Sequence, residues 1–126
     1  MSRKFLAYWL PLYLYAGLIF YISSIPKPLP DISIPYIDKF LHALEYAVFG
    51  GLAARAFRNS KKEALRENFK VLAVIAALVY GASDEFHQYF VSSRACDCFD
   101  LISDFIGGTI GAIIYGRYYR FQRHAL

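Results

Sequence analysis

The sequence predicts an all-α polytopic membrane protein, a bundle of four transmembrane helices joined by short connections. Three observations predict this fold class. The chain of 126 residues is 57% hydrophobic with a mean hydropathy of +0.32, it contains four apolar stretches of about the length of a membrane span, and no internal repeat divides it. A soluble helical bundle is the alternative, but helices that are apolar on every side have no solvated face. We expect one transmembrane domain, residues 1–126.

The first apolar stretch runs from Phe5 to Ile25 and contains 21 residues without a charge. At about 1.5 Å of rise per residue, a helix of this length crosses a hydrocarbon core of about 30 Å. It is longer than the apolar region of a removable signal peptide, about 7 to 15 residues, and it lacks a small-residue cleavage pattern. We therefore expect it to remain as the first span.

The remaining apolar stretches run from about Asp38 to Phe57, from Val71 to about Phe90 and from about Phe99 to Gly116. Each is long enough to cross a bilayer as a helix. The chain therefore has an even number of predicted spans, which places both termini on the same side of the membrane.

Two of the connections carry local signals. Residues 23–36 hold four of the five prolines, which excludes regular helix and predicts an extended outer loop. Between the second and third stretches, Ser60 followed three residues later by Glu63 has the form of a capping box. We expect the third helix to begin there, in water, before it enters the hydrocarbon.

The fourteen basic residues predict the orientation of the bundle. Eleven of them fall on the side of the termini, and three on the other side, Lys27, Lys39 and Arg94. By the positive-inside rule, the termini and the middle connection are cytoplasmic, and the protein resides in the inner membrane of the cell. The net charge of +4 is thereby explained as a topology signal, and no nucleic-acid partner is expected. The eleven are Arg3, Lys4, Arg55, Arg58, Lys61, Lys62, Arg66, Lys70, Arg117, Arg120 and Arg123.

Polar side chains recur at the outer end of three of the four stretches. Asp38, His42 and Glu45 are spaced so that they share one helical face. In the third stretch Asp84, Glu85 and Gln88 form one stripe that also contains Gly81, while His87 points away from it. In the fourth stretch a single face carries Asp97, Asp100, Asp104, Gly107 and Gly111.

The polar groups of the three stretches lie at the same depth in the membrane, in addition to sharing a direction within each helix. Glu45, Glu85 and Asp104 each lie seven residues inside the outer boundary of their stretch, which is about 10 Å by helical rise. A carboxylate facing lipid at the centre of a span costs about 2.5 to 3.5 kcal/mol on insertion scales, and somewhat less at this depth. Several such groups must therefore converge inside the bundle.

Structural roles are the alternative to a functional site. Asp38 and Asp97 stand where helix N-caps belong, and Asp100 completes an acidic first turn. The deeper residues could form a hydrogen-bonded network that only fixes packing. Gly107 and Gly111 have the GxxxG spacing that lets another helix approach, either within one chain or in a homodimer.

The charges at this end do not balance. Seven acids face only Lys39, Arg94 and a His42 that can be protonated. Either some carboxyl groups stay protonated or a cation is bound. A divalent cation with oxygen ligands would suit the acids, although no recognised metal-loop spacing is present. Cys96 and Cys98 flank Asp97, and they could form a strained disulfide, remain free thiols or bind a soft metal.

Three segments resemble the ordered motifs of the VanZ-like family of small bacterial membrane proteins. They are DKFLHALEYAVFG from Asp38, SDEFHQYF from Ser83 and RACDCFDLISDFIGG from Arg94, and the Ser23 to Pro26 segment is similar too. The resemblance implies functional positions on the second, third and fourth helices. These positions are Asp38, Lys39, His42, Tyr46, Glu85, Gln88, Arg94, Asp97, Asp100, Asp104 and Gly107.

The chain departs from the family pattern at two positions. Family members usually have asparagine in place of Asp104 and glycine in place of Ser93. The family is named for a protein that lowers susceptibility to the glycopeptide antibiotic teicoplanin, and the resemblance implies a possible role in resistance but no settled reaction.

Three functions are compatible with these features. The first is an outer-face membrane enzyme, a hydrolase or transferase acting on a lipid or lipid-linked envelope precursor, with His42 or Glu85 as general base and Arg94 and Lys39 holding an anionic group. The second is a non-catalytic envelope protein that binds such a component. The third, proton-coupled transport, is disfavoured because four short helices without an inverted repeat leave little room for alternating access.

The candidate residues fall into three groups by expected role. The catalytic candidates are His42, Glu85, Asp97 and Asp100; the substrate-binding candidates are Lys39, Glu45, Tyr46, Gln88, Arg94 and Asp104; the structural candidates are Asp38, Gly107 and Gly111.

Overall fold

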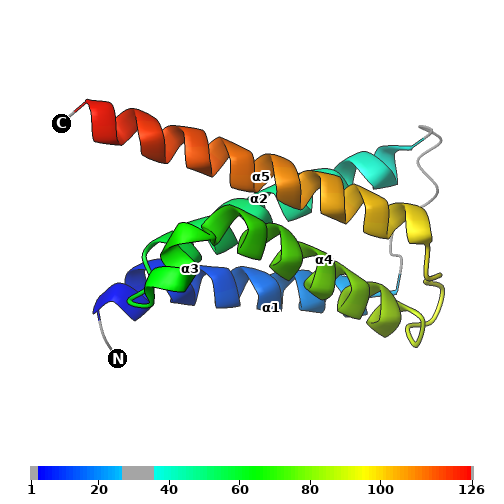
Figure 1. The fold of residues 1–126 in the computed structure, drawn as a ribbon. Helices are drawn as coiled ribbons and strands as arrows, with labels where there is room; N and C mark the ends of the chain where they lie inside the picture. Colours follow the sequence, from blue (N-terminus) through cyan, green and yellow to red (C-terminus); the bar gives the residue numbers. More distant parts are fainter. Residues whose placement is uncertain (1–2, 27–35, 126) are drawn as a thin grey trace.

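The computed structural model describes residues 3–26 and 36–125, and all regular structure within these ranges is helical. The prediction of an all-α fold is confirmed for these residues. The proline-rich outer loop falls mainly on residues 27–35 and lies outside the described residues. The elements in chain order are η1 (Phe5–Trp9, a π-helical turn), α1 (Leu10–Ser24), α2 (Ile37–Arg58), α3 (Glu63–Glu67), α4 (Phe69–Gln88) and α5 (Cys98–His124) (Figure 1).

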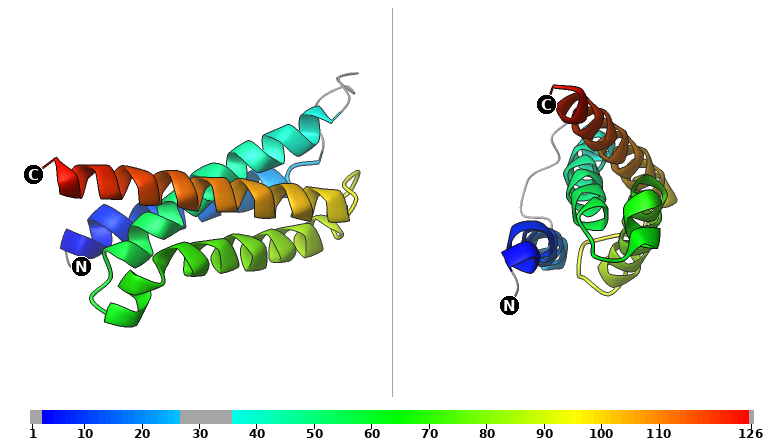
Figure 2. Two further views of the ribbon diagram at one scale, coloured as in Figure 1. Left: turned by 45° about the horizontal axis from the view of Figure 1, so that its top comes forward. Right: turned by 60° about the vertical axis from the view of Figure 1, so that its left-hand side comes forward.

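The four long helices alternate in direction. Both ends of the described chain and the connection through α3 lie at one end of the bundle, while the end of α1, the start of α2 and the loop between α4 and α5 lie at the other (Figure 1). Helices α2, α4 and α5 pack together, with α2 and α5 in the most extensive contact. Helix α1 lies to one side, next to α2 and α4, and packs more loosely (Figure 2).

Two glycines of α5 explain its close contact with α2. A Cβ atom added at Gly107 would overlap the backbone carbonyl of Ala43, and one added at Gly111 would overlap the carbonyl of Ala47. Both glycines are buried. The GxxxG stripe is therefore used within the chain, and this face is not free to pair with a second copy.

Small and polar side chains fill the interior of the bundle, whereas large apolar side chains cover its exterior. In the part of the chain that the structure describes, six of the ten buried hydrophobic residues are alanines, and five carboxyl or amide side chains are also buried, Asp84, Glu85, Gln88, Asp100 and Asp104. All four long helices expose large apolar side chains, for example Leu14, Leu41, Val79 and Ile114. This distribution is the reverse of the usual arrangement in a soluble domain.

Among the described residues, two helical stretches are long and apolar enough to cross a membrane, residues 5–24 and α5. Within the most apolar part of each stretch, only 11% and 33% of the residues are buried, respectively. Neither stretch therefore resembles the core helix of a soluble protein. Helices α2 and α4 are long enough, but charged side chains such as Glu45 and Glu85 interrupt their apolar stretches. The number of spans and the orientation of the termini therefore remain predictions.

The predicted start of the third helix is wrong. Ser60 accepts a hydrogen bond from the Lys62 amide at 3.3 Å instead of capping a helix, and the N-cap of α3 is Lys62. The helix also does not continue into the hydrocarbon, because Asn68 ends it. The Asn68 side-chain amide donates to the Ala64 carbonyl at 2.9 Å, which closes α3 one residue before α4 begins.

The two predicted aspartate caps have different outcomes. Asp97 is the N-cap of α5, and its carboxylate accepts the Phe99 amide at 2.8 Å, as expected. Asp38 is not a cap, because α2 begins one residue earlier, after Tyr36 in the left-handed conformation. Asp38 instead lies in the first turn, where a negative charge is favoured by the helix dipole.

Candidate functional site

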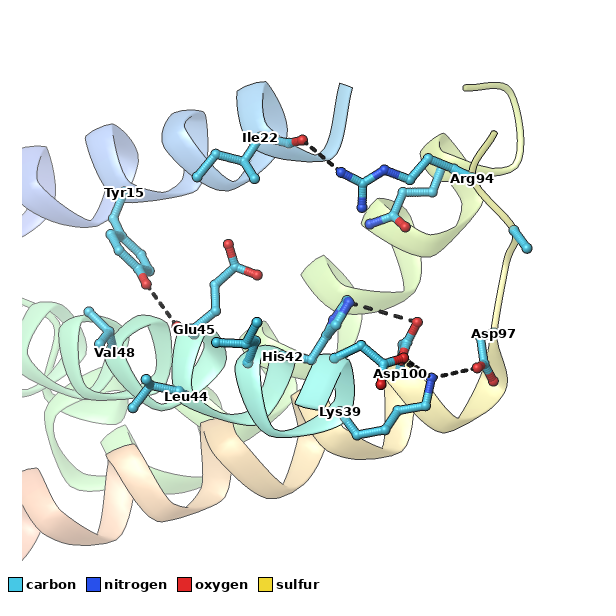
Figure 3. Close-up of a pocket in the computed structure, with 14 residues that line it drawn as sticks. Tyr15, Ile22, Lys39, His42, Leu44, Glu45, Val48, Arg94, Asp97 and Asp100 are labelled. Carbon is cyan, nitrogen blue, oxygen red and sulfur yellow. Dashed lines mark hydrogen bonds and ion pairs between the residues drawn. The ribbon is translucent and has the colours of Figure 1, made fainter. Parts of the chain in front are cut away.

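A cavity of about 610 Å³ opens at the end of the bundle opposite to the chain termini (Figure 3). It lies between α1, α2, the end of α4, and the start of α5 with the segment that leads into it. Most of the sequence-predicted polar residues line it, and the rest of the lining is mainly apolar. The predicted residues are Asp38, Lys39, His42, Glu45, Gln88, Arg94, Asp97 and Asp100; the others are Tyr15, Ile22, Leu41, Leu44, Val48 and Ala95.

Lys39 is the centre of an ion-pair cluster that connects α2 to the start of α5. Its ammonium lies 2.9 Å from Asp38, 2.6 Å from Asp97 and 2.5 Å from Asp100 (Figure 3). Hydrogen bonds from Lys39 and from the Phe99 amide hold the pKa of the Asp97 carboxyl below its usual value. Because three carboxylates already occupy the ammonium, an anionic ligand would have to compete with them.

His42 is held between two aspartates of α5. Its Nδ1 lies 2.9 Å from Asp104, which is completely buried, and its Nε2 lies 3.7 Å from Asp100. The contact with Asp104 engages Nδ1 and leaves Nε2 on the side of Asp100. Asp104 thus orients the imidazole.

Glu85 joins α4 to the start of α5. One of its carboxylate oxygens, Oε2, accepts the Asp97 amide at 3.0 Å, while Oε1 is buried and accepts no hydrogen bond from any described residue. One turn along α4, the Gln88 amide donates to Asp84 at 3.1 Å. Gln88 lines the cavity, whereas Glu85 lies behind it.

Glu45 and Tyr46 lie deeper along α2. The Glu45 side chain points from α2 toward α1, and the Tyr15 hydroxyl donates to the Glu45 backbone carbonyl at 3.0 Å (Figure 3). Tyr46 is fully buried beside Phe49 and does not line the cavity, so its predicted role in binding substrate is not supported by its position.

Arg94 stands at the mouth of the cavity, but its hydrogen bonds go to α1. The guanidinium donates to the Ile25 carbonyl at 3.0 and 3.1 Å and to the Ile22 carbonyl at 3.2 Å (Figure 3). A cation at the last carbonyls of a helix is favoured by the helix dipole. Arg94 therefore anchors the end of α1 to the loop before α5, and it forms no ion pair with an acid in the described part of the chain.

The weaker candidates lie apart from this cluster. His87 stacks on Phe20 with ring centroids 4.4 Å apart and contacts the Ser24 hydroxyl at 2.9 Å, so it faces α1; the helical pattern had indicated only that it points away from the polar stripe. Cys96 and Cys98 are exposed free thiols and form no disulfide.

The contribution of α1 could not be found from the sequence. Tyr15 and Ile22 line the cavity, yet in the sequence they are ordinary members of an apolar span. Asp84 was recognised as part of the polar stripe but not as a site residue, and the structure buries it with one oxygen unpaired among the described residues. Three side chains lie close enough in space to hold one metal ion together, His42, Glu85 and Asp100. Their ligand atoms lie within 4.8 Å of one another.

A second hollow of about 390 Å³ lies toward the other end, near the connection through α3. Basic side chains dominate its lining, which consists of Arg58, Arg66, Glu67, Phe69, Lys70, Gly116, Tyr119 and Arg120. The bundle is thus acidic in the region of the first cavity and basic in the region of the second.

The comparisons with known proteins gave one match. The sequence model of the family described as VanZ/LLP1 matches residues 3–119, which is nearly the whole chain. No curated protein and no solved structure matches the chain.

Proposed function

The chain belongs to the VanZ/LLP1 family, and we propose that it is an inner-membrane protein that binds, and acts on, the anionic group of a lipid or lipid-linked envelope component. The family match and two apolar helices support membrane residence. We also propose that the protein has four spans, that the site faces outward and that the ligand is anionic.

The distribution of side chains supports four spans. Large apolar residues are exposed on all four long helices, whereas Asp84, Glu85, Asp100 and Asp104 are buried and Glu45 lines the cavity. Keeping these acids away from lipid avoids the cost of about 2.5 to 3.5 kcal/mol for a carboxylate at the centre of a span. The acids within the predicted spans are therefore compatible with helices that cross the membrane.

Charge asymmetry supports a cytoplasmic location for the termini. The basic hollow around Arg58, Arg66 and Lys70 lies toward the end that holds both described termini, and the acidic cluster lies at the opposite end. Under the positive-inside rule the basic end is cytoplasmic. The cavity then opens toward the exterior, where envelope precursors are assembled.

The observation that carries the proposed ligand is the mixed lining of the cavity. The lining holds Lys39, Arg94 and His42, four acids of which three engage Lys39, and the apolar side chains Leu41, Leu44 and Val48. These three apolar residues are about half exposed, so the cavity is continuous with the apolar outer surface of α2. A molecule with an anionic group and an acyl or isoprenyl chain matches the basic and the apolar parts of this lining.

Two side chains at or behind the cavity lining, His42 and Glu85, can accept or donate a proton. His42 presents Nε2 toward Asp100, and Glu85 stands behind them with one unpaired oxygen. His and Glu side chains are common general bases, and water or a hydroxyl of the ligand would be the nucleophile. If Arg94 gave up its hydrogen bonds to α1, its guanidinium could form two parallel hydrogen bonds to a phosphate or carboxylate.

The test compares envelope lipids from cells with and without the protein by mass spectrometry. Glu85→Gln removes a charge and nearly preserves the shape of the side chain. Arg94→Lys keeps the positive charge but loses the planar guanidinium that can form two parallel hydrogen bonds. We expect any modification to disappear with Glu85→Gln and to fall about tenfold with Arg94→Lys, the value of one charge-assisted hydrogen bond. Glu63→Gln and Arg123→Lys, both exposed and distant, are the matched controls. Full modification by both site variants would contradict catalysis.

A non-catalytic binding protein is the second candidate, and one observation favours it. Glu85, one of the two candidate general bases, does not line the cavity, and Nε2 of His42, the other candidate, faces Asp100. Such a protein would retain an anionic lipid without changing it. Lipid that copurifies with the wild-type chain and is unmodified in mass would favour this candidate. A change in teicoplanin susceptibility on expression would connect either activity to resistance.

A further inference from the structure

We propose that His42, Glu85 and Asp100 form a binding site for one divalent transition-metal ion, with Asp104 as the residue that positions His42. The three ligands come from three different helices, α2, α4 and α5. Their ligand atoms lie within 4.8 Å of one another, and His42 Nε2 and Asp100 Oδ2 are 3.7 Å apart. Ligands about 2.0 to 2.2 Å from a tetrahedral ion are separated by roughly 3.3 to 3.6 Å, so small side-chain rotations complete the site.

Glu85 supplies an independent indication of a ligand. The residue is 3% exposed, and its Oε1 is buried without a hydrogen bond from any described residue. Its other oxygen is fixed by the Asp97 amide, so Oε1 is the atom left to bind an ion. A buried carboxylate oxygen without a partner is unfavourable, and coordination of a cation removes that cost.

The surroundings of His42 match those of a metal ligand. Metal-binding histidines usually donate their second ring nitrogen to a carboxylate, which fixes the tautomer and the orientation of the ring. Here Nδ1 contacts the fully buried Asp104 at 2.9 Å, and Nε2 faces Asp100. The imidazole is thus held with its free nitrogen toward the other two ligands.

The local excess of negative charge also favours the binding of a cation. Among the described residues, the ion pairs of the acids at this end are all made with Lys39 or His42. Glu85 and Asp84 have no cationic side chain within ion-pair distance in that set. A divalent ion between Glu85 and Asp100 would neutralise the excess and would add a positive charge close to the cavity.

The mixed donor set indicates the class of ion. One imidazole nitrogen and two carboxylate oxygens suit zinc or manganese, whereas magnesium and calcium prefer oxygen ligands alone. We therefore use Zn²⁺ as the probe. The measurement needs no lipid, so its outcome is independent of the envelope function proposed above.

The experiment uses the untagged full chain in detergent, with Cys96→Ser and Cys98→Ser to remove exposed thiols that bind zinc adventitiously. The protein is stripped with a chelator, incubated with Zn²⁺ and desalted, and bound zinc is measured by mass spectrometry. We expect one ion per chain. His42→Ala and Glu85→Gln should lower the affinity by more than about 100-fold, and Asp104→Asn by about 10- to 100-fold with unchanged stoichiometry at saturation.

Two controls separate this site from other binding. His87→Ala removes the neighbouring histidine that faces α1, and Glu63→Gln removes an exposed acid on α3; both should retain one ion at wild-type affinity. The zinc X-ray absorption spectrum of the unaltered site should show one imidazole nitrogen and carboxylate oxygens. This spectrum decides the question even where His42→Ala or Glu85→Gln fails to fold. Absence of stoichiometric zinc, a spectrum without imidazole, or wild-type affinity in both site variants would overturn the proposal.

Discussion

At the scale of single residues, Lys39 and Asp104 have the largest effect on how the site is arranged. Lys39 gathers Asp38, Asp97 and Asp100 around one ammonium and so joins two helices whose N-termini lie side by side. Asp104 is completely buried and lies 2.9 Å from His42 Nδ1, so it sets the orientation of the imidazole. An asparagine at this position could still accept a hydrogen bond from Nδ1, but it would lack the carboxyl group.

The ion pair of Asp97 predicts a dependence of stability on pH. Its pKa is held below the usual 3.8 by the Lys39 hydrogen bond and the Phe99 amide, so its stabilising effect is present above that value and is lost as the pH falls through the lower folded pKa. Asp97→Asn keeps an N-cap side chain but removes the charge. We expect this variant to be less stable than wild type at pH 7 and indistinguishable from it at strongly acidic pH.

Thermal unfolding of the detergent-solubilised protein at the two pH values measures this difference. Glu67→Gln, at an exposed acid in α3, is the control and should change stability at neither pH. Equal stability of Asp97→Asn and wild type at pH 7 would show that the ion pair with Lys39 does not stabilise the fold.

At the scale of the elements, the contact between α2 and α5 determines how the polar faces meet. Gly107 and Gly111 bring the backbone of α5 against that of α2, and the same face of α5 carries Asp100 and Asp104 toward His42. Helix α1 contributes less packing, and its end is retained by the guanidinium of Arg94. The cavity lies where this more loosely packed helix adjoins α2.

Substitution of Gly107 tests the close approach. In Gly107→Ala the new Cβ would overlap the Ala43 carbonyl, so α2 and α5 must separate, and we expect a loss of about 1 to 3 kcal/mol in the free energy of unfolding. The matched control is Gly17→Ala in α1, where no atom lies within 4 Å of the added Cβ. Because alanine favours helix over glycine by about 0.5 to 1 kcal/mol, this control should be neutral or stabilising. Equal effects of the two changes on the unfolding midpoint would contradict the contact.

At the scale of the whole molecule, an apolar exterior encloses a polar interior, and the two ends carry opposite charge. The acidic cluster and the first cavity lie opposite the termini, and the basic hollow lies near the connection through α3. This asymmetry supports an orientation in which the cavity opens to the exterior. It also keeps the excess of basic residues on the side of the negative cytoplasmic leaflet.

Cysteine labelling in intact cells tests the orientation. Cys96 is exposed in the loop before α5, so with Cys98→Ser it should react with a membrane-impermeant maleimide added outside. In a Cys96→Ser, Cys98→Ser, Lys61→Cys variant the single thiol lies in the connection between α2 and α3, where Lys61 is exposed. It should react only after the membrane is permeabilised. The opposite pattern would place the cavity in the cytoplasm and contradict a site that acts on outer-face precursors.

The sequence by itself determined the helical class, the approximate extent of the four long helices and the family, because apolar length and motif spacing are local properties of the chain. Helical periodicity also identified the polar faces that carry His42 and the residues that the structure buries, Asp84, Glu85, Gln88, Asp100 and Asp104. Only the tertiary structure decided their partners: Lys39 with three aspartates, His42 with Asp104, Arg94 with the carbonyls of α1, and Tyr15 as part of the cavity. Periodicity specifies the face of a helix, but the distance between two faces depends on helix rotation and separation, which backbone contacts at Gly107 and Gly111 set in three dimensions.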